Sequence, residues 1–482
     1  MKNYNLIIFG NGAAAFAAAI KATELTEGKA SILMVGKGPL GGTCVNVGCI
    51  PSKYLLELSN RYFYPLNSKI PGIVFNHANL DFSKVMESVR RLISTLREEK
   101  YNLTIEKYDN VEVIDGKAYF TSPSTVIVES SNGNNSNNGK FEARADYFLI
   151  ATGSRPSIPP IDGLNRIGYL TSDTIWQLNK LPDDLIVIGG GSIGLEIGQA
   201  LRHFGSDVKI VEALPRIAYQ AEPELSRALQ HILEQEGIRF YLRSRVSKVS
   251  KDNSKIKVEV ISKEGLKVIE GDSLLIAAGR KPNTDSLGLE RAAIELDTKG
   301  AIKVNASMMT SNPKVYAAGD VVSKSLMLET LAAREGVIAA MNMFSNGKVK
   351  FTIDYLETPW AIFTYPNLAG VGMSEEEVMS KYGACSCRVV ELKQVPKARI
   401  LMHEYGLAKM VIRPEDGRIL GMQVLAPSAA EFITEMAIAI KYKMRYDELI
   451  DIVHVFPTIS EVLKINAQAF IRDVNVMSCC VE

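Results

Sequence analysis

Two cysteines stand five positions apart near the start of the chain, in the segment Gly-Gly-Thr-Cys44-Val-Asn-Val-Gly-Cys49-Ile-Pro-Ser-Lys. Residues 54–58 behind them are helix-forming, which predicts both thiols near a helix N-terminus. That position lowers the pKa of a thiol, so we expect a thiolate at neutral pH. Two thiols that close so small a loop can cycle between dithiol and disulfide. The alternative, two buried structural cysteines, is disfavoured by the Gly-Gly-Thr in front of them.

A second pair, Cys479 and Cys480, stands in the last residues of the sequence. Adjacent cysteines on a terminal tail are poor candidates for core packing, and a disulfide between them would be a strained ring. As thiolates they are soft ligands suited to a soft cation such as Hg(II). A third pair, Cys385 and Cys387, could offer another soft-metal contact, but two cysteines on one face of a surface strand fit equally well. With no assisting motif nearby, we favour a structural role for this third pair.

The elements that would position these thiols begin with a pattern that occurs twice. Residues 4–10 predict a short buried strand, and the alanine-rich residues 13–23 predict the helix that follows. Residues 185–189 predict a second strand, with a helix starting near residue 195. A strand, a glycine turn and a helix, repeated in one chain, indicate two nucleotide-binding βαβ modules.

The two glycine turns have the residues that a pyrophosphate requires. In the first, Gly10 permits the tight turn, Gly12 lets the backbone approach the phosphates, and the small Ala15 allows close packing of helix and strand. The phosphates would lie on unpaired N–H groups at the helix start. The second turn repeats this arrangement with Gly189, Gly191 and Gly194.

The strand that follows each module differs between the two. Residues 207–211 predict a strand ending at Glu212, whose carboxylate can accept both ribose hydroxyls of NADH and would repel the 2′-phosphate of NADPH. Arg216 stands close enough to soften that preference, and we lean to NADH. After residues 31–35 of the first module, the corresponding positions hold Gly36 and Lys37 and no acid.

From about residue 351 the sequence changes character. Residues 406–413 and 418–426 flank a Pro-Glu-Asp-Gly turn and predict a β-hairpin, and residues 428–442 predict a helix. The chain is therefore predicted to be α/β, with two Rossmann-like nucleotide-binding domains and a C-terminal α+β domain.

Charge and hydropathy exclude several classes of protein. The 482 residues include 55 Lys and Arg against 54 Asp and Glu, a formal net charge of +1, which argues against nucleic acid or an anionic membrane as the main partner. Six cysteines are too few for a disulfide scaffold. No stretch offers about 18 uninterrupted apolar residues, so we expect no membrane span and a cytoplasmic location.

The segment around Cys44 and Cys49 resembles the redox-active segment of the FAD-dependent pyridine nucleotide–disulfide oxidoreductases. Residues 151–153, 277–283 and 315–320 are similar to that family's domain junctions and to its flavin-binding aspartate segment. The resemblance implies a redox role for Cys44 and Cys49 and an ion pair of Lys53 with Glu196 beside the flavin. It implies FAD and NAD(P)H as cofactors, with contacts at Gly10, Gly12, Ala15, Gly42, Thr43, Lys53, Thr152, Gly153, Gly189, Gly191, Gly194, Glu212, Gly279, Arg280, Gly319 and Asp320.

The same resemblance implies a domain plan and a homodimer. Residues 1–152 and 281–350 would bind FAD and residues 153–280 would bind NAD(P)H. Residues 351–482 would form the dimerisation domain and carry the Cys479–Cys480 tail.

Two features distinguish among members of the family. Those that act on small disulfides have a His-Pro-Thr-x-Ser-Glu segment, whose histidine exchanges protons with a thiol, and this chain has Phe456 in place of that histidine. A phenyl ring cannot move a proton, which disfavours a thioredoxin-reductase-like or lipoamide-dehydrogenase-like activity, although both remain alternatives. Outside catalysis, sequestration of a soft metal or redox sensing would also explain the thiols.

The C-terminal cysteines, residues 394–399 and residues 467–470 resemble the mercuric ion reductases of the family. This resemblance implies reduction of thiol-bound Hg(II) to Hg(0), with the metal passing from Cys479 and Cys480 to Cys44 and Cys49. The chain departs from that group at Phe456, where a tyrosine is usual, and at Ser192, where some members have a tyrosine.

Overall fold

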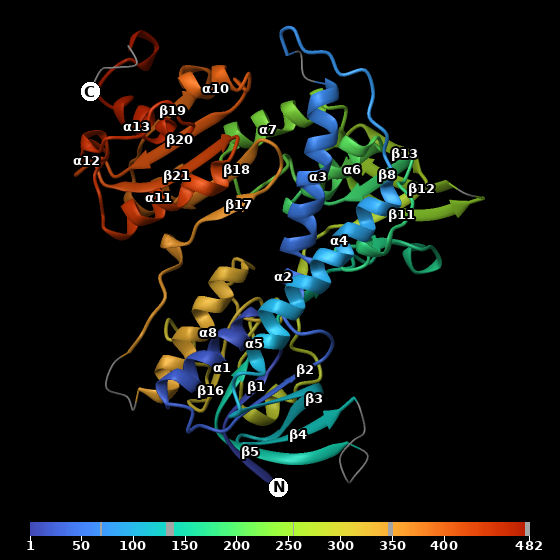
Figure 1. Cartoon of the computed structure of the whole chain (residues 1–482), viewed down its shortest axis with the longest axis vertical. Coiled ribbons are helices and arrows are strands. Elements are labelled where there is room, and N and C mark those ends of the chain that lie inside the picture. Colours follow the sequence, from blue (N-terminus) through green and yellow to red (C-terminus); the bar gives the residue numbers. More distant parts are fainter. Residues whose placement is uncertain (68–69, 132–138, 254, 346–349, 478–482) are drawn as a thin grey trace. The chain divides into compact units, whose positions relative to one another are not determined.

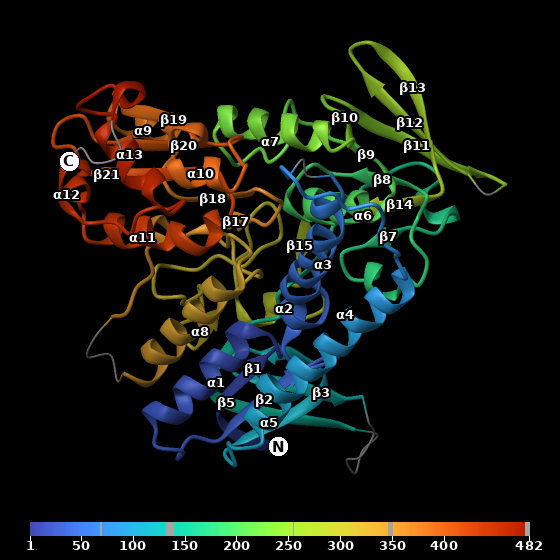
Figure 2. The ribbon, with the colours of Figure 1, turned by 45° about the horizontal axis from the view of Figure 1, so that its top comes forward.

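A computed structural model of the chain describes residues 1–67, 70–131, 139–253, 255–345 and 350–477. The chain forms two compact units, each built from three stretches of sequence. The first comprises Met1–Ser52, Met86–Ser157 and Gly279–Asp354, and the second comprises Lys53–Val85, Ile158–Ala278 and Tyr355–Glu482. Figures 1 and 2 show their elements coloured along the sequence.

A mostly parallel sheet forms the centre of the first unit. Its strands β3, β2, β1, β5 and β16 are parallel in that order, and β4 joins β3 to β5 in antiparallel pairing. A short antiparallel pair, β6 and β15, also belongs to this unit. The strand bounds are β1 (Lys2–Phe9), β2 (Ile32–Gly36), β3 (Val111–Ser122), β4 (Thr125–Ser130), β5 (Lys140–Ile150), β6 (Ser154–Pro156), β15 (Arg280–Pro282) and β16 (Val315–Ala317).

Alternation of side chains along β1 explains the two cores on either side of this sheet. Leu6 and Ile8 are buried among the small residues of α1, whereas Ile7 and Phe9 are buried on the opposite face. Helix α1 packs along α8, as both views show, and Gly336 makes this possible because a Cβ there would lie 2.2 Å from the Ala14 carbonyl oxygen. The helices assigned to or entering this unit are α1 (Ala13–Leu25), α2 (Gly42–Val47), α3 (Cys49–Asn67), α4 (Phe82–Arg97), α5 (Leu103–Ile105) and α8 (Glu329–Phe344).

The second unit contains a second parallel sheet, in the order β10-β9-β8-β14-β7, and an antiparallel sheet of β11, β12 and β13. Two helices, α6 and α7, follow β8 and β9 in turn. The bounds are β7 (Leu170–Thr171), β8 (Asp184–Ile188), α6 (Ser192–Phe204), β9 (Asp207–Val211), α7 (Pro223–Gln235), β10 (Arg239–Tyr241), β11 (Arg245–Asp252), β12 (Lys255–Ser262), β13 (Gly265–Gly271) and β14 (Ser273–Ile276).

The C-terminal part of the second unit is an antiparallel sheet, in the order β17-β18-β21-β20-β19, with α11 packed on β18 and β21 (Figure 1). The predicted hairpin and helix of this region correspond to β20, β21 and α11. The bounds are β17 (Trp360–Ile362), β18 (Asn367–Gly372), α9 (Glu375–Tyr382), β19 (Ser386–Glu391), α10 (Pro396–Ile400), β20 (Leu407–Ile412), β21 (Ile419–Ala426), α11 (Ala429–Lys441), α12 (Tyr446–Asp451) and α13 (Glu461–Gln468).

The predicted fold class is confirmed: two strand–glycine–helix modules each lie in a parallel sheet, and an α+β region follows them. None of the helices in the described part of the chain has the length and apolar character that a membrane crossing requires.

Candidate active site

The first pair of thiols lies where two helices meet in sequence. Cys44 is in the first turn of α2, and Cys49 is the first residue of α3, with Gly48 between the helices. The loop is fixed by Asn46, whose side-chain amide donates hydrogen bonds to the carbonyls of Leu40 (2.9 Å) and Gly42 (2.8 Å). Sequence reasoning placed the cysteines near helix starts, and the structure agrees. It did not single out Asn46, because a lone asparagine between two cysteines has no distinctive spacing.

The expectation of a lowered thiol pKa is wrong for Cys44. Its thiol is hydrogen-bonded with that of Cys49, and this contact, followed by burial, raises the pKa of Cys44 well above the usual thiol range. Glu329, the first residue of α8, adds to the rise because its carboxylate is nearby. A helix N-terminus lowers the pKa of a thiol through its dipole. At Cys44 a neighbouring thiol, a carboxylate and desolvation act in the opposite direction and outweigh it.

Lys53 and Glu196 form the ion pair that the resemblance implied. The Lys53 Nζ atom lies 2.6 Å from Glu196 Oε2, and the ammonium also lies over the ring of Phe363. The Glu196 side chain is 5% exposed and that of Lys53 is 33% exposed. The second Glu196 oxygen accepts a hydrogen bond from the Phe363 N–H at 2.9 Å. Glu196, on α6, is therefore held at both oxygens and keeps Lys53 in one place.

The first glycine turn has the shape that a dinucleotide needs. Gly10 has φ +125°, and a Cβ there would lie 2.1 Å from the Ala151 carbonyl oxygen. A Cβ at Gly42 would lie 2.7 Å from the Gly12 Cα atom, so backbone alone lines this space. Among the described residues no side chain caps α1, whose N-cap is Gly12 and whose buried Ala15 packs inward. These residues fit the pyrophosphate of an FAD molecule.

Residues from three further segments meet in the first unit around Asp320. The Ser154 hydroxyl donates a hydrogen bond of 2.6 Å to Asp320 Oδ2, and Arg280 Nε donates one of 2.7 Å to that hydroxyl. Thr152 Oγ1 donates to the Asn283 carbonyl at 2.7 Å. The structure thus brings Thr152, Arg280 and Asp320 into one region beside Gly153, Gly279 and Gly319. Ser154, which joins them, was missed because serine follows the junction motif without any marked pattern.

The second glycine turn resembles the first. At the contact between the turn and the end of the next strand, however, the glycine and the residue with a side chain have changed places. In the first module Asn11 lies against Gly36, where a Cβ would be 2.8 Å from the Asn11 side chain. In the second module Gly190 is the small residue, and Glu212 lies against it.

Glu212 accepts hydrogen bonds of 2.7 Å from the N–H groups of Gly190 and Leu214. The acid predicted at the end of β9 therefore lies beside the second turn, whose N-cap residue is Gly191. No side chain caps α6 among the described residues, and Gly194 packs its Cα closely against the Gly189 carbonyl. Like the first turn, this region offers closely approaching backbone and a helix N-terminus that no described side chain caps. It therefore fits the pyrophosphate of a nicotinamide dinucleotide.

Arg216 does not pair with Glu212. Its guanidinium lies over the Tyr219 ring and donates hydrogen bonds to the carbonyls of Tyr219 (2.9 Å) and Ala221 (3.3 Å).

The side chain of Phe456, in the C-terminal region, is half-exposed. His454, two residues earlier, is engaged elsewhere: its ring nitrogens lie 3.1 Å from Glu435 Oε1 and 3.0 Å from the Ile452 carbonyl. The hydrogen bond to Glu435 raises the pKa of His454.

Several apolar side chains near Phe456 are also exposed, as expected of a surface that pairs with another chain: Ile438, Tyr442, Ile452, Val453 and Val455. Cys479 and Cys480 lie outside the described residues.

Comparison with known families identifies the class of protein. The chain matches the model described as "Pyridine nucleotide-disulphide oxidoreductase" over residues 4–336 and that family's "dimerisation domain" over residues 358–467. The chain therefore belongs to the pyridine nucleotide-disulphide oxidoreductase family. It is an enzyme of the flavin disulfide reductase type with a flavin and a nicotinamide cofactor, and its dimerisation domain indicates a homodimer.

Individual relatives are similar along nearly the whole chain. A protein named mercuric reductase from Lysinibacillus sphaericus is 36% identical over 99% of this chain and 84% of its own length. One of the same name from Streptomyces lividans is 36% identical over 99% of this chain and 98% of its own length. Among solved structures, the Cu(II) complex of the HOCl-induced flavoprotein disulfide reductase RclA from Escherichia coli has 26% identity and a TM-score of 0.84, covering 98% of this chain and 100% of that chain.

Proposed function

We propose that this enzyme reduces Hg(II) to Hg(0) with NAD(P)H, through FAD and the Cys44–Cys49 pair, and that Cys479 and Cys480 deliver the metal. The observation that carries the proposal is the 36% identity to mercuric reductases over 99% of the chain. The soft thiols of the sequence and Phe456 at the position of the proton-exchanging histidine point the same way.

The reaction balances with one nicotinamide for each metal ion. NAD(P)H gives up a hydride, which is two electrons and a proton, Hg(II) takes the two electrons, and the proton goes to solvent. Bound FAD supplies the hydride-accepting chemistry and passes electrons on in pairs. Lys53, held by Glu196, would present a positive charge to the flavin ring, and Asp320 would bind the ribityl chain.

Besides the redox role of Cys44 and Cys49, the thiols hold the cation. Each Hg–S bond to Cys479 or Cys480 breaks as one to Cys44 or Cys49 forms, so the metal stays two-coordinate and is never released. The incoming thiol loses its proton as it binds, and the outgoing thiolate can take that proton up.

The preference between nicotinamides rests on Glu212. Its carboxylate lies at the end of β9 beside the second glycine turn, where a 2′-phosphate would meet a negative charge. We therefore favour NADH. Replacing Glu212 with alanine should raise kcat/KM for NADPH relative to that for NADH, and an unchanged ratio would remove the basis for this preference.

The domain plan and the assembly complete the proposal. Residues 1–152 and 281–350 bind FAD, residues 153–280 bind NAD(P)H, and residues 351–482 pair two chains. Each tail would then serve the redox thiols of the opposite chain. The exposed apolar side chains near Phe456 support such a pairing surface.

A disulfide reductase acting on a thioredoxin-like protein or a lipoamide-like compound is the second candidate. The RclA structure, titled a flavoprotein disulfide reductase, favours it, whereas Phe456 argues against it. The two are separated by measuring NADH oxidation by the holoenzyme with thiol-complexed Hg(II), with thioredoxin, with DTNB and with lipoamide as acceptors.

We expect turnover with Hg(II) and little with the disulfides. The Cys479→Ala/Cys480→Ala variant should lose turnover with thiol-complexed Hg(II) and keep its FAD and its reduction by NADH. Turnover with a disulfide but not with Hg(II) would overturn the proposal.

A further inference from the structure

The pair Cys385 and Cys387 belongs to the edge strand of the C-terminal sheet. Cys385 precedes β19 directly, and Cys387 is its second residue. Because one residue separates them in extended backbone, both side chains project from the same face. Cys387 pairs with Val411 of β20 and Val389 pairs with Lys409, so the Lys409 side chain lies on that face too.

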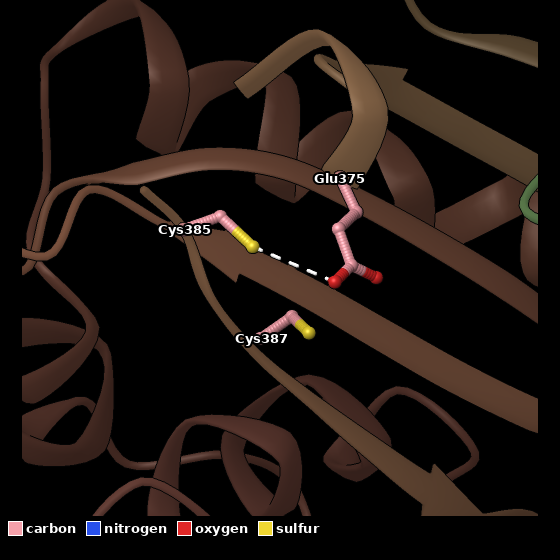
Figure 3. Close-up of side chains that lie close together, drawn as sticks. All are labelled: Glu375, Cys385 and Cys387. Carbon is pink, nitrogen blue, oxygen red and sulfur yellow. Dashed lines mark hydrogen bonds between the residues drawn. The ribbon is translucent and has the colours of Figure 1, made fainter. Parts of the chain in front are cut away.

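A third potential ligand comes from a different element. Glu375 is the first residue of α9, whose start is fixed by the Ser374–Glu377 capping box. The Cys385 thiol donates a hydrogen bond to Glu375 Oε1, with a sulfur–oxygen distance of 3.6 Å. Figure 3 shows the Cys385 sulfur pointing toward this carboxylate and the Cys387 sulfur close to both.

The spacing of these three groups suits one metal ion. One ligand atom from each residue lies within 4.8 Å of the other two. Zinc–thiolate bonds are about 2.3 Å long, so two sulfurs on one tetrahedral cation are about 3.8 Å apart. A cation can therefore reach both thiols and the carboxylate with little movement of the chain.

The charges around the site also favour a cation. The buried Lys409 ammonium, whose side chain is 1% exposed, contacts Glu222 (2.9 Å), Glu224 (2.7 Å) and Glu375 (2.6 Å). Three carboxylates around one ammonium leave the cluster a formal charge of −2. The Lys409 ammonium contacts the Oε2 atom of Glu375, which leaves Oε1 directed at the Cys385 thiol.

We propose that Cys385, Cys387 and Glu375 bind one thiophilic divalent cation through two thiolates and one carboxylate. Two S–metal bonds form, two thiol protons pass to solvent, and no group changes oxidation state. Three protein ligands leave a fourth position of a tetrahedral cation for water or an external thiol. This inference is independent of the proposed Hg(II) reduction, because it uses neither the flavin nor the redox thiols.

The site can be isolated from the other thiols by replacing Cys44, Cys49, Cys479 and Cys480 with serine in the full-length holoenzyme. FAD content and the flavin spectrum check that this variant is folded. The probe is Cd(II) alone, measured by equilibrium dialysis and by thiolate-to-cadmium charge-transfer absorption. We expect one Cd(II) per chain with that absorption, and its loss when Cys385→Ser and Cys387→Ser are added.

Two glutamine substitutions on the same helix test the third ligand. Glu375→Gln removes the anionic oxygen ligand and should weaken Cd(II) binding by at least about 10- to 100-fold, the loss that follows even when a group supporting a ligand is removed. Glu376→Gln removes the same charge from an exposed neighbour and should leave the affinity within about twofold, because an exposed charge is screened. The proposal would be overturned if the variant with serine at positions 44, 49, 479 and 480 bound no Cd(II) through thiolates. It would also be overturned if that variant bound Cd(II) equally well after Cys385 and Cys387 were replaced.

Discussion

Two regions of this molecule combine a pair of thiols with a lysine–glutamate ion pair, and they differ in backbone and in charge balance. Cys44 and Cys49 stand at helix starts, and Lys53, one helical turn after Cys49 in sequence, forms an ion pair with Glu196. Cys385 and Cys387 lie on an edge strand, and the nearby Lys409 has three carboxylate partners.

The comparison indicates that position relative to a nucleotide-binding turn decides what a thiol pair can do. The segment bearing Cys44 begins at Gly42, whose backbone lies against Gly12 of the first turn. A source of electrons is therefore expected beside that pair. The Cys385–Cys387 pair lies on a sheet that has no such turn and has a negative cluster instead, which suits coordination without electron transfer.

The largest expected effect comes from the first pair. Replacing Cys44 and Cys49 with serine should lower Hg(II)-dependent NADH oxidation by at least about 10³-fold, which corresponds to about 4 kcal/mol, because both inner metal ligands and the redox couple are lost. Steady-state kinetics measure this, with FAD content as the folding control. Activity within tenfold of wild type would contradict the assignment of this pair.

Removing the lysine of the second region should act on stability and not on chemistry. Lys409→Met leaves three carboxylates together without a cation, and loss of one partner from a buried ion pair costs about 3–5 kcal/mol. Denaturant unfolding measures the change. The control is Lys441→Met, which breaks the exposed pair with Glu357 and should cost about 0–1 kcal/mol. Equal effects of the two substitutions would show that burial of Lys409 has no special importance.

Removing the charge from the partner of Lys53 should have a smaller effect. Glu196→Gln keeps an acceptor for the Phe363 N–H but takes the anion from Lys53, and loss of one preorganised electrostatic contact typically costs on the order of 10²-fold in rate. Since Glu196 acts through Lys53 as a positioning residue, the flavin absorption spectrum and the rate of its reduction by NADH should change as well. Glu57→Gln, on the exposed Arg61 pair of α3, is the matched control. An unaltered flavin spectrum in the Glu196 variant would limit Glu196 to a structural role.

The smallest effect is expected from the second thiol pair. Cys385→Ser/Cys387→Ser should leave kcat and KM for Hg(II) within about twofold, because these thiols are placed in no step of the reduction. A loss of tenfold or more in kcat/KM would erase the distinction between the two regions and bring the surface pair into metal delivery.

Local sequence was enough to predict the nucleotide-binding modules and the position of Cys44 and Cys49, because a tight turn and a close approach require glycine at fixed spacing. The Lys53–Glu196 pair was accessible only through family resemblance, since 143 residues separate its members. The raised pKa of Cys44 could not be predicted, because it depends on burial and on contacts with Cys49 and Glu329. Glu375 was missed beside Cys385 and Cys387 for the same reason: the fold of α9 against β19 brings it there.

The central claim is that electrons from the nicotinamide reach mercury. The most direct measurement counts the volatile mercury that the anaerobic holoenzyme releases from thiol-complexed Hg(II) for each NADH oxidised. The proposed function predicts one Hg(0) per NADH and, when Hg(II) is omitted, no cofactor oxidation beyond the stoichiometric reduction of the bound FAD and the redox thiols. NADH oxidation that proceeds equally without Hg(II), or that yields no elemental mercury, would contradict it.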